Sequence, residues 1–131
     1  MNSRTLTQSA ESNAGPGVIV ALLSDPTRIP NWAPAFADMV TGDACSGWRA
    51  TKSGHDFALR VVVEENAGTV DYLREIAPGQ EGGAYIRVLP RPGGGSVVVM
   101  TIPVLPGAEA ATGATSLSGE LNALLSLARG G

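Results

Sequence analysis

The chain has 131 residues, of which 44% are hydrophobic and 16% are charged, and its net charge is −3. This length predicts one domain over residues 1–131, and this hydrophobic fraction excludes a disordered chain. The sequence has no basic block, so we expect no nucleic-acid partner, and it has no apolar run long enough for insertion into a membrane.

Cys45 is the only cysteine and His55 is the only histidine. One thiol and one imidazole cannot complete a zinc site, and the acidic residues do not follow a metal-ligand spacing, so we expect no metal. Gly93–Ser96 is followed by no Lys of a phosphate-binding loop and predicts a hairpin turn, so we expect no cofactor. The single cysteine, and the lack of an apolar signal core after Met1, make the cytoplasm the expected location.

The first part of the chain predicts one strand and two short helices. Residues 4–9 have the pattern of an edge strand. Residues 18–24 are apolar enough for a buried strand or a helix, and the Leu22–Leu23 pair favours a helix. Asp25 is placed to cap a second helical turn over 26–31, since a proline follows it, and proline suits the first helical position.

Six segments of alternating character follow and predict short strands. They cover residues 36–41, 48–52, 55–64, 69–76, 84–89 and 96–102. The 55–64 segment alternates most clearly, with Phe57, Leu59, Val61 and Val63 on one face. Because loops with glycine join most neighbours, we expect hairpins and an antiparallel sheet.

The last part of the chain predicts an amphipathic helix. Leu117, Leu121, Leu124 and Leu125 recur at the spacing of one helical face. Ser116 is a candidate N-cap and the terminal glycines are a candidate stop, which predicts a helix over 116–129. Such a helix is about 20 Å long, enough to cross a small sheet.

Three stretches carry a resemblance to a known superfamily. They are Leu23-Ser-Asp25-Pro-x-Arg28-x-Pro-x-Trp32 with the later Trp48, Gly68-Thr-Val-Asp71-Tyr72, and Gly95-Ser96-Val97. With the order of elements, they make the chain resemble the START-like polyketide cyclase/dehydratase superfamily (SRPBCC) over about residues 4–129. The resemblance implies an α+β helix-grip fold: a curved antiparallel sheet of six to seven strands wrapped around the C-terminal helix, with two short helices after the first strand.

The resemblance also implies an apolar cavity between the sheet and the last helix. Members of this superfamily bind lipids, sterols or polyketides, and some are aromatases or cyclases. The superfamily shares no single catalytic motif, so no catalytic residue is transferred to this chain. We expect the cavity wall to include the following residues: Trp32, Phe36, Val61, Val63, Tyr72, Arg74, Tyr85, Val97, Val99, Leu121 and Leu125.

Two pairs of polar residues lie on neighbouring predicted strands. Tyr72 and Arg74 share one face of their strand, and Tyr85 and Arg87 share one face of the next. If a face points into the cavity, its phenol and guanidinium groups would orient a ligand carbonyl or carboxylate. The alternative is that these are solvent faces with cross-strand pairs.

Three functions follow from these predictions. The first is binding of a hydrophobic small molecule, such as a lipid or a polyketide. The second is a cyclase or dehydratase reaction that uses Tyr72, Arg74 and Tyr85, with His55 as a further candidate; it requires these side chains to converge. The third is an interaction protein without a cavity, such as a homodimer formed through the sheet; a cavity well below about 300 Å³ would favour it.

Overall fold

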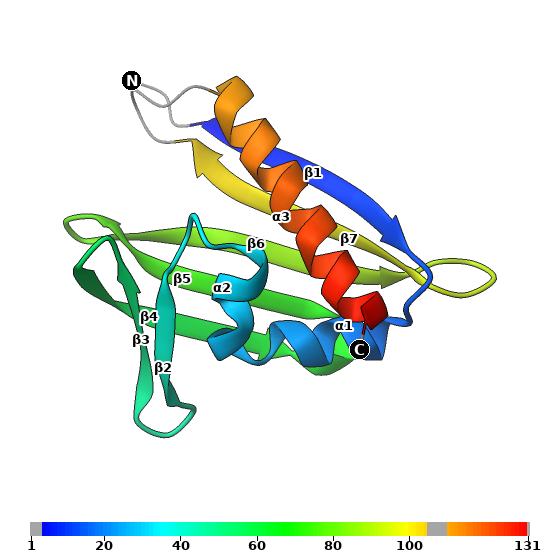
Figure 1. The fold of residues 1–131 in the computed structure, drawn as a ribbon, viewed down its shortest axis with the longest axis horizontal. Helices are drawn as coiled ribbons and strands as arrows, with labels where there is room; N and C mark the ends of the chain where they lie inside the picture. Colours follow the sequence, from blue (N-terminus) through cyan, green and yellow to red (C-terminus); the bar gives the residue numbers. More distant parts are fainter. Residues whose placement is uncertain (1–3, 105–109, 131) are drawn as a thin grey trace.

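The computed structural model describes residues 4–104 and 110–130, and the side chains of residues 5–104 and 116–129. Seven antiparallel strands form one curved sheet in the order β1-β7-β6-β5-β4-β3-β2 (Figure 1). The edges of the sheet are β1 (Arg4–Ser12) and β2 (Met39–Asp43). The predicted edge position of the first strand is therefore confirmed.

The remaining strands form a meander in which each pairs with the next along the chain. They are β3 (Gly47–Lys52), β4 (His55–Glu64), β5 (Thr69–Ala77), β6 (Gln80–Pro90) and β7 (Ser96–Val104). The β4 prediction is confirmed over its whole length. The strands predicted over 69–76 and 84–89 are longer than expected, because β5 and β6 extend to a tight turn at Pro78–Gly79, where Gly79 adopts a φ of +75°.

Three short helical elements link β1 to β2. They are α1 (Pro16–Leu23), the 3₁₀ turn η1 (Pro26–Arg28) and α2 (Ile29–Trp32). The side chain of Asp25 accepts a hydrogen bond from the Thr27 backbone N–H at 3.2 Å, so the predicted cap is confirmed. Phe36 lies in a turn instead of a strand, since its N–H donates to the Ala33 carbonyl at 3.0 Å.

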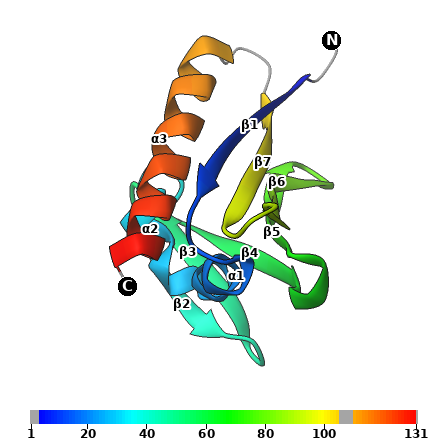
Figure 2. The same cartoon turned by 90° about the vertical axis from the view of Figure 1, so that its right-hand side faces the viewer.

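The last helix, α3 (Ala110–Gly130), lies across one face of the sheet and contacts β1, β7, α1 and α2 (Figures 1 and 2). It begins before the predicted start at Ser116, because Ala110 and Ala111 are strong helix formers and extend it. Ser116 therefore lies inside the helix and is not its N-cap. Among the described helices, none combines the length and the hydropathy that crossing a bilayer requires.

The core lies between the helices and the inner face of the sheet. The four leucines of the predicted helical face are all buried: Leu117, Leu121, Leu124 and Leu125. Opposite them, Ile86 on β6 and Val98 on β7 are fully buried. The α+β helix-grip architecture predicted from the sequence is thus the one observed.

Candidate functional site

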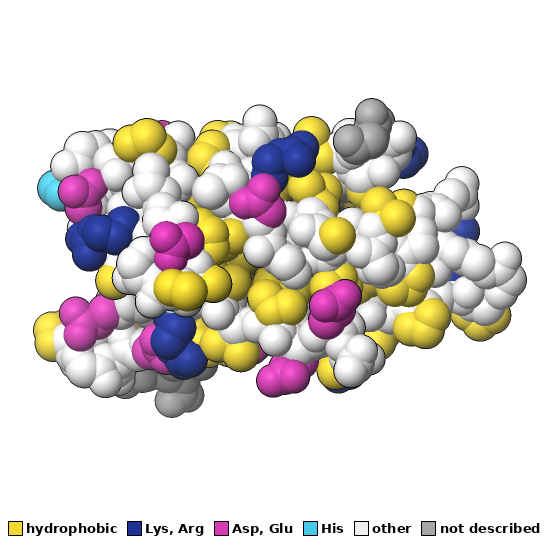
Figure 3. Space-filling view, turned by 90° about the horizontal axis from the view of Figure 1, so that it is seen from below, with side chains coloured by type: hydrophobic (Ala, Val, Ile, Leu, Met, Phe, Trp, Pro, Cys, Tyr) yellow, Lys and Arg dark blue, Asp and Glu magenta, His cyan; other side chains and the backbone are white. Residues whose placement is uncertain are grey.

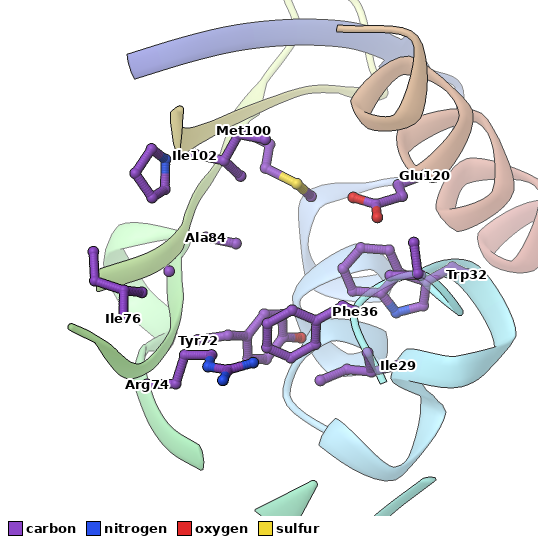
Figure 4. Close-up of a pocket in the computed structure, with 14 residues that line it drawn as sticks. Ile29, Trp32, Phe36, Tyr72, Arg74, Ile76, Ala84, Met100, Ile102 and Glu120 are labelled. Carbon is purple, nitrogen blue, oxygen red and sulfur yellow. The ribbon is translucent and has the colours of Figure 1, made fainter. Parts of the chain in front are cut away.

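A cavity of about 390 Å³ lies between α2 with its following turn, strands β5 to β7, and α3 (Figure 4). Its wall is mostly apolar, and the uncharged residues that line it are Ile29, Trp32, Ala33, Ala35, Phe36, Tyr72, Ile76, Gly83, Ala84, Met100, Ile102 and Pro103. Of the wall residues that the structure describes, Arg74 and Glu120 are the two that are charged. The volume exceeds the limit of about 300 Å³ below which an interaction protein without a cavity would be favoured.

The cavity forms where the inward positions of β6 carry small residues. The register pairs Gly82 with Arg74 and Ala84 with Tyr72, so both small residues face the same side as those large ones. The next inward positions, Ile86 and Val88, are large and buried. Space therefore remains beside Ala84, which lines the cavity, whereas the Ile76 side chain occupies the position beside Gly82 and large side chains fill the space further along the strand.

Two aromatic residues with polar atoms form part of the wall. The ring centroids of Trp32 and Tyr72 lie 6.1 Å apart at an interplanar angle of 39°. The Tyr72 hydroxyl donates a hydrogen bond to the backbone carbonyl of Leu23, and burial raises the pKa of this phenol. The buried Trp32 Nε1 has no hydrogen-bond partner among the described residues.

Arg74 is held by aromatic rings at the cavity wall. Its guanidinium carbon lies 3.7 Å from the centroid of the Phe57 ring, a cation–π contact. The Phe57 ring in turn meets Phe36 edge-to-face at 5.8 Å. No carboxylate of the described residues lies within ion-pair distance of Arg74. The described residues therefore hold this positive charge in place without a carboxylate beside it.

Glu120 is the one acidic residue among the described residues of the wall. It lies three residues after Leu117 and four before Leu124, which places it on the buried face of α3. In Figure 4 its carboxyl group points into the cavity, toward Met100 and Trp32. Burial raises the pKa of this half-buried carboxyl to about 7, and no described cation pairs with it.

The structure brings four of the predicted site residues to the cavity: Trp32, Phe36, Tyr72 and Arg74. Val61 and Val63 pack against the core from β4, and Leu121 and Leu125 are buried in it, but these four do not line the cavity. Whether the four lining residues contact a ligand stays a prediction.

Three predicted wall residues lie on the opposite face of the sheet. Val97 and Val99 are half-buried there, because Val98 and Met100 occupy the inward positions of β7. Tyr85 is 43% exposed, because its neighbour Ile86 faces inward on β6. For all three residues the predicted face is therefore wrong by one position, which in a strand exchanges the two sides.

The side chains required by the enzyme hypothesis do not converge. His55 is exposed at the start of β4, and Tyr85 lies on the outer face of the sheet. Cys45 is exposed in the turn between β2 and β3. The described part of the chain also contains no group of three or more His, Cys, Asp or Glu residues that could hold a metal ion.

A second hollow of about 660 Å³ lies beside β3, β4 and β5. Its wall is more polar, and the charged residues in it are Arg49, Arg60, Arg74, Glu75 and Glu81. Arg60 and Glu81 form an exposed ion pair at 2.6 Å, which satisfies two of these charges. On the face shown in Figure 3, the Lys and Arg side chains lie apart from one another and form no continuous basic patch. The apolar cavity is thus the stronger candidate site.

No model of a known protein family matches the sequence, and no curated protein matches it either. Solved structures do match. The Zhui aromatase/cyclase from Streptomyces sp. R1128 is 14% identical, with a TM-score of 0.72, and the match covers 98% of this chain and 94% of that one. A START superfamily protein from Mycobacterium smegmatis is 14% identical, with a TM-score of 0.70 and coverages of 95% and 97%.

A third similar structure, Ara h 8.0201, is 17% identical, with a TM-score of 0.63, and the match covers 99% of this chain and all of that one (100%). At these identities the similarity concerns the fold. It confirms that the chain has the START-like helix-grip fold that the sequence motifs implied.

Proposed function

We propose that the chain, as one unit over residues 1–131, binds a hydrophobic small molecule in the cavity between the sheet and α3. The observation that carries this proposal is the cavity of about 390 Å³ with its mostly apolar wall. A lipid or a polyketide-like compound fits this description. A cytoplasmic location and a homodimer stay predictions from the sequence.

The physical basis of the proposal is the removal of apolar surface from water. Burial of such surface yields about 25 cal/mol per Å² before the cost of ordering the ligand. The wall is already formed: Met100 and Ile29 are each 1% exposed and held by the core around them. The similarity to an aromatase/cyclase supports a small organic molecule as the ligand.

A fluorescence titration with 2-ethylnaphthalene, an apolar and rigid probe, tests the proposal. We expect a Kd on the order of 10–100 μM for a ligand of this size. The Ala84→Leu substitution adds three carbons inside the cavity and should weaken binding at least about tenfold. Ala58→Leu is the matched control, because Ala58 is exposed on β4 and lines the second hollow.

The two variants also distinguish the two hollows. Binding that is lost in Ala84→Leu and kept in Ala58→Leu supports the proposed cavity. Binding that is lost only in Ala58→Leu places the probe in the second hollow, and a wild-type protein that binds no probe contradicts the proposal.

A further inference from the structure

We propose that the ligand carries two polar groups at its opposite ends: a hydrogen-bond donor, such as a hydroxyl, bound by Glu120, and an acceptor, such as a carbonyl, bound by Arg74. The body between them is apolar. This inference rests on the proposed function and names the ligand chemistry of the same cavity.

At the acidic end of the cavity, the described residues provide no charged partner for Glu120. The Glu120 carboxyl points into the cavity, and no described residue forms an ion pair with it (Figure 4). Met100 and Trp32, toward which it points, offer an apolar surface. A carboxyl group away from bulk water is unfavourable without a hydrogen bond, so a ligand hydroxyl would supply a partner that the described residues do not. Both the carboxylate and the carboxylic acid accept a hydrogen bond from such a hydroxyl.

The basic end of the cavity has free donors. The Phe57 ring covers one face of the Arg74 guanidinium at 3.7 Å, which leaves the N–H groups in the guanidinium plane unoccupied by that contact. No carboxylate of the described chain pairs with them. A carbonyl oxygen is the uncharged group that such planar donors recognise best.

The positions of Glu120 and Arg74 determine where the polar groups of the ligand lie. Figure 4 shows Glu120 and Arg74 on opposite sides of the cavity, with apolar side chains between them. Each end of a ligand that spans the cavity therefore meets one of the two groups, so its donor and its acceptor lie at opposite ends of the molecule. The unpartnered Trp32 Nε1 is a further donor on the same wall for a ligand acceptor.

Four naphthalenes of nearly equal shape test this inference. They are 2-ethylnaphthalene with no polar group, 6-ethyl-2-naphthol with the donor, 2-acetylnaphthalene with the acceptor, and 6-acetyl-2-naphthol with both. In fluorescence titrations at pH 7, each polar group should tighten binding about fivefold to tenfold over 2-ethylnaphthalene.

Two substitutions assign each gain to its residue. Glu120→Leu should abolish the gain from the hydroxyl and keep the gain from the carbonyl, and Arg74→Met should do the reverse. Glu64→Gln and Arg87→Met are the controls, since both side chains are exposed on other parts of the sheet and should change neither ratio. Glu120→Gln and Arg74→Gln, which keep polar groups of similar size, repeat the test if an apolar variant does not fold.

The outcomes separate this inference from the proposed function. If 2-ethylnaphthalene binds the wild-type protein as tightly as both single-group probes, the inferred polar ends of the ligand are wrong. The proposed binding of a hydrophobic molecule in the cavity is then still supported. If the gains persist in Glu120→Leu and Arg74→Met, other residues bind these groups and the inference is overturned. If no probe binds, the proposed function fails and this inference fails with it.

Discussion

The space between the sheet and the helices has a packed part and a hollow part, and β6, β7 and α3 contribute to both. The packed part contains Leu23, Ile86, Val98 and Leu124, which are fully buried and do not line the cavity. The hollow part is the cavity itself. Along β6, the inward residue changes from Ala84 in the hollow part to Ile86 in the packed part. The size of the inward side chains therefore decides where a helix on a curved sheet leaves space for a ligand.

The largest effect is expected in the packed part. Leu124→Ala should lower the free energy of unfolding by about 2–5 kcal/mol, because its fully buried side chain would leave a void among large neighbours. Urea denaturation measures this loss. Leu127→Ala is the control on the same helix, since Leu127 is only half-buried and should lose less. Equal losses in the two variants would contradict the distinction between a packed and a looser part.

Tyr72 belongs to both parts, because its ring lines the cavity while its hydroxyl bonds the Leu23 carbonyl. Tyr72→Phe should lower the free energy of unfolding by about 1–2 kcal/mol, since a buried carbonyl loses its donor. The exposed Tyr85 provides the control, and Tyr85→Phe should leave stability unchanged in the same denaturation assay. If Tyr72→Phe leaves the free energy of unfolding unchanged, this hydrogen bond does not hold α1 to the sheet.

The sequence predicted the packed part better than the hollow part. The leucines of α3 recur at the helical spacing, and the apolar residues of β4 recur at every second position. Each regular pattern identifies which face of its element is buried. The Val97–Met100 run is apolar at every position, so its alternation is uninformative and the assigned face was wrong by one residue. The cavity depends on small inward residues of β6, and small residues give no periodic signal.

Glu120 shows most clearly what the sequence analysis missed. Its spacing from Leu117 and Leu124 placed it on the buried face of α3, which was a usable signal. A charge in an apolar face is more often at the edge of that face than inside it, so the pattern alone does not point to a cavity. The neighbours that make this carboxyl part of a wall come from β7 and α2, far away in the chain.

The Glu120 carboxyl gives the hollow part a pH dependence that the packed part lacks. Burial raises its pKa to about 7 from the model-peptide value of 4.5, so the folded state binds the proton more tightly than the unfolded state. Raising the pH from 5 to 8 removes this proton and should lower the free energy of unfolding by about 1 kcal/mol, a figure reduced for partial exposure to solvent.

Urea denaturation at pH 5, 6, 7 and 8 measures this slope, and the difference between the wild type and Glu120→Gln isolates the carboxyl. The free energy of unfolding of Glu120→Gln should change less with pH than that of the wild type. Asp38 and Asp43 do not interfere, because hydrogen bonds to each lower its pKa below 3.8, so their effect falls at more acidic pH. A slope that is identical in the variant would show that the Glu120 carboxyl is not buried in the folded protein.

The smallest effect on stability is expected where the effect on ligand binding is largest. Ala84→Leu places an apolar side chain into existing space, so the burial it gains and the packing strain it introduces should nearly cancel. We expect its free energy of unfolding to stay within about 1 kcal/mol of the wild type. If Ala84→Leu loses as much free energy of unfolding as Leu124→Ala, the space beside Ala84 is already filled in solution. The hollow part would then be packed like the rest of the core.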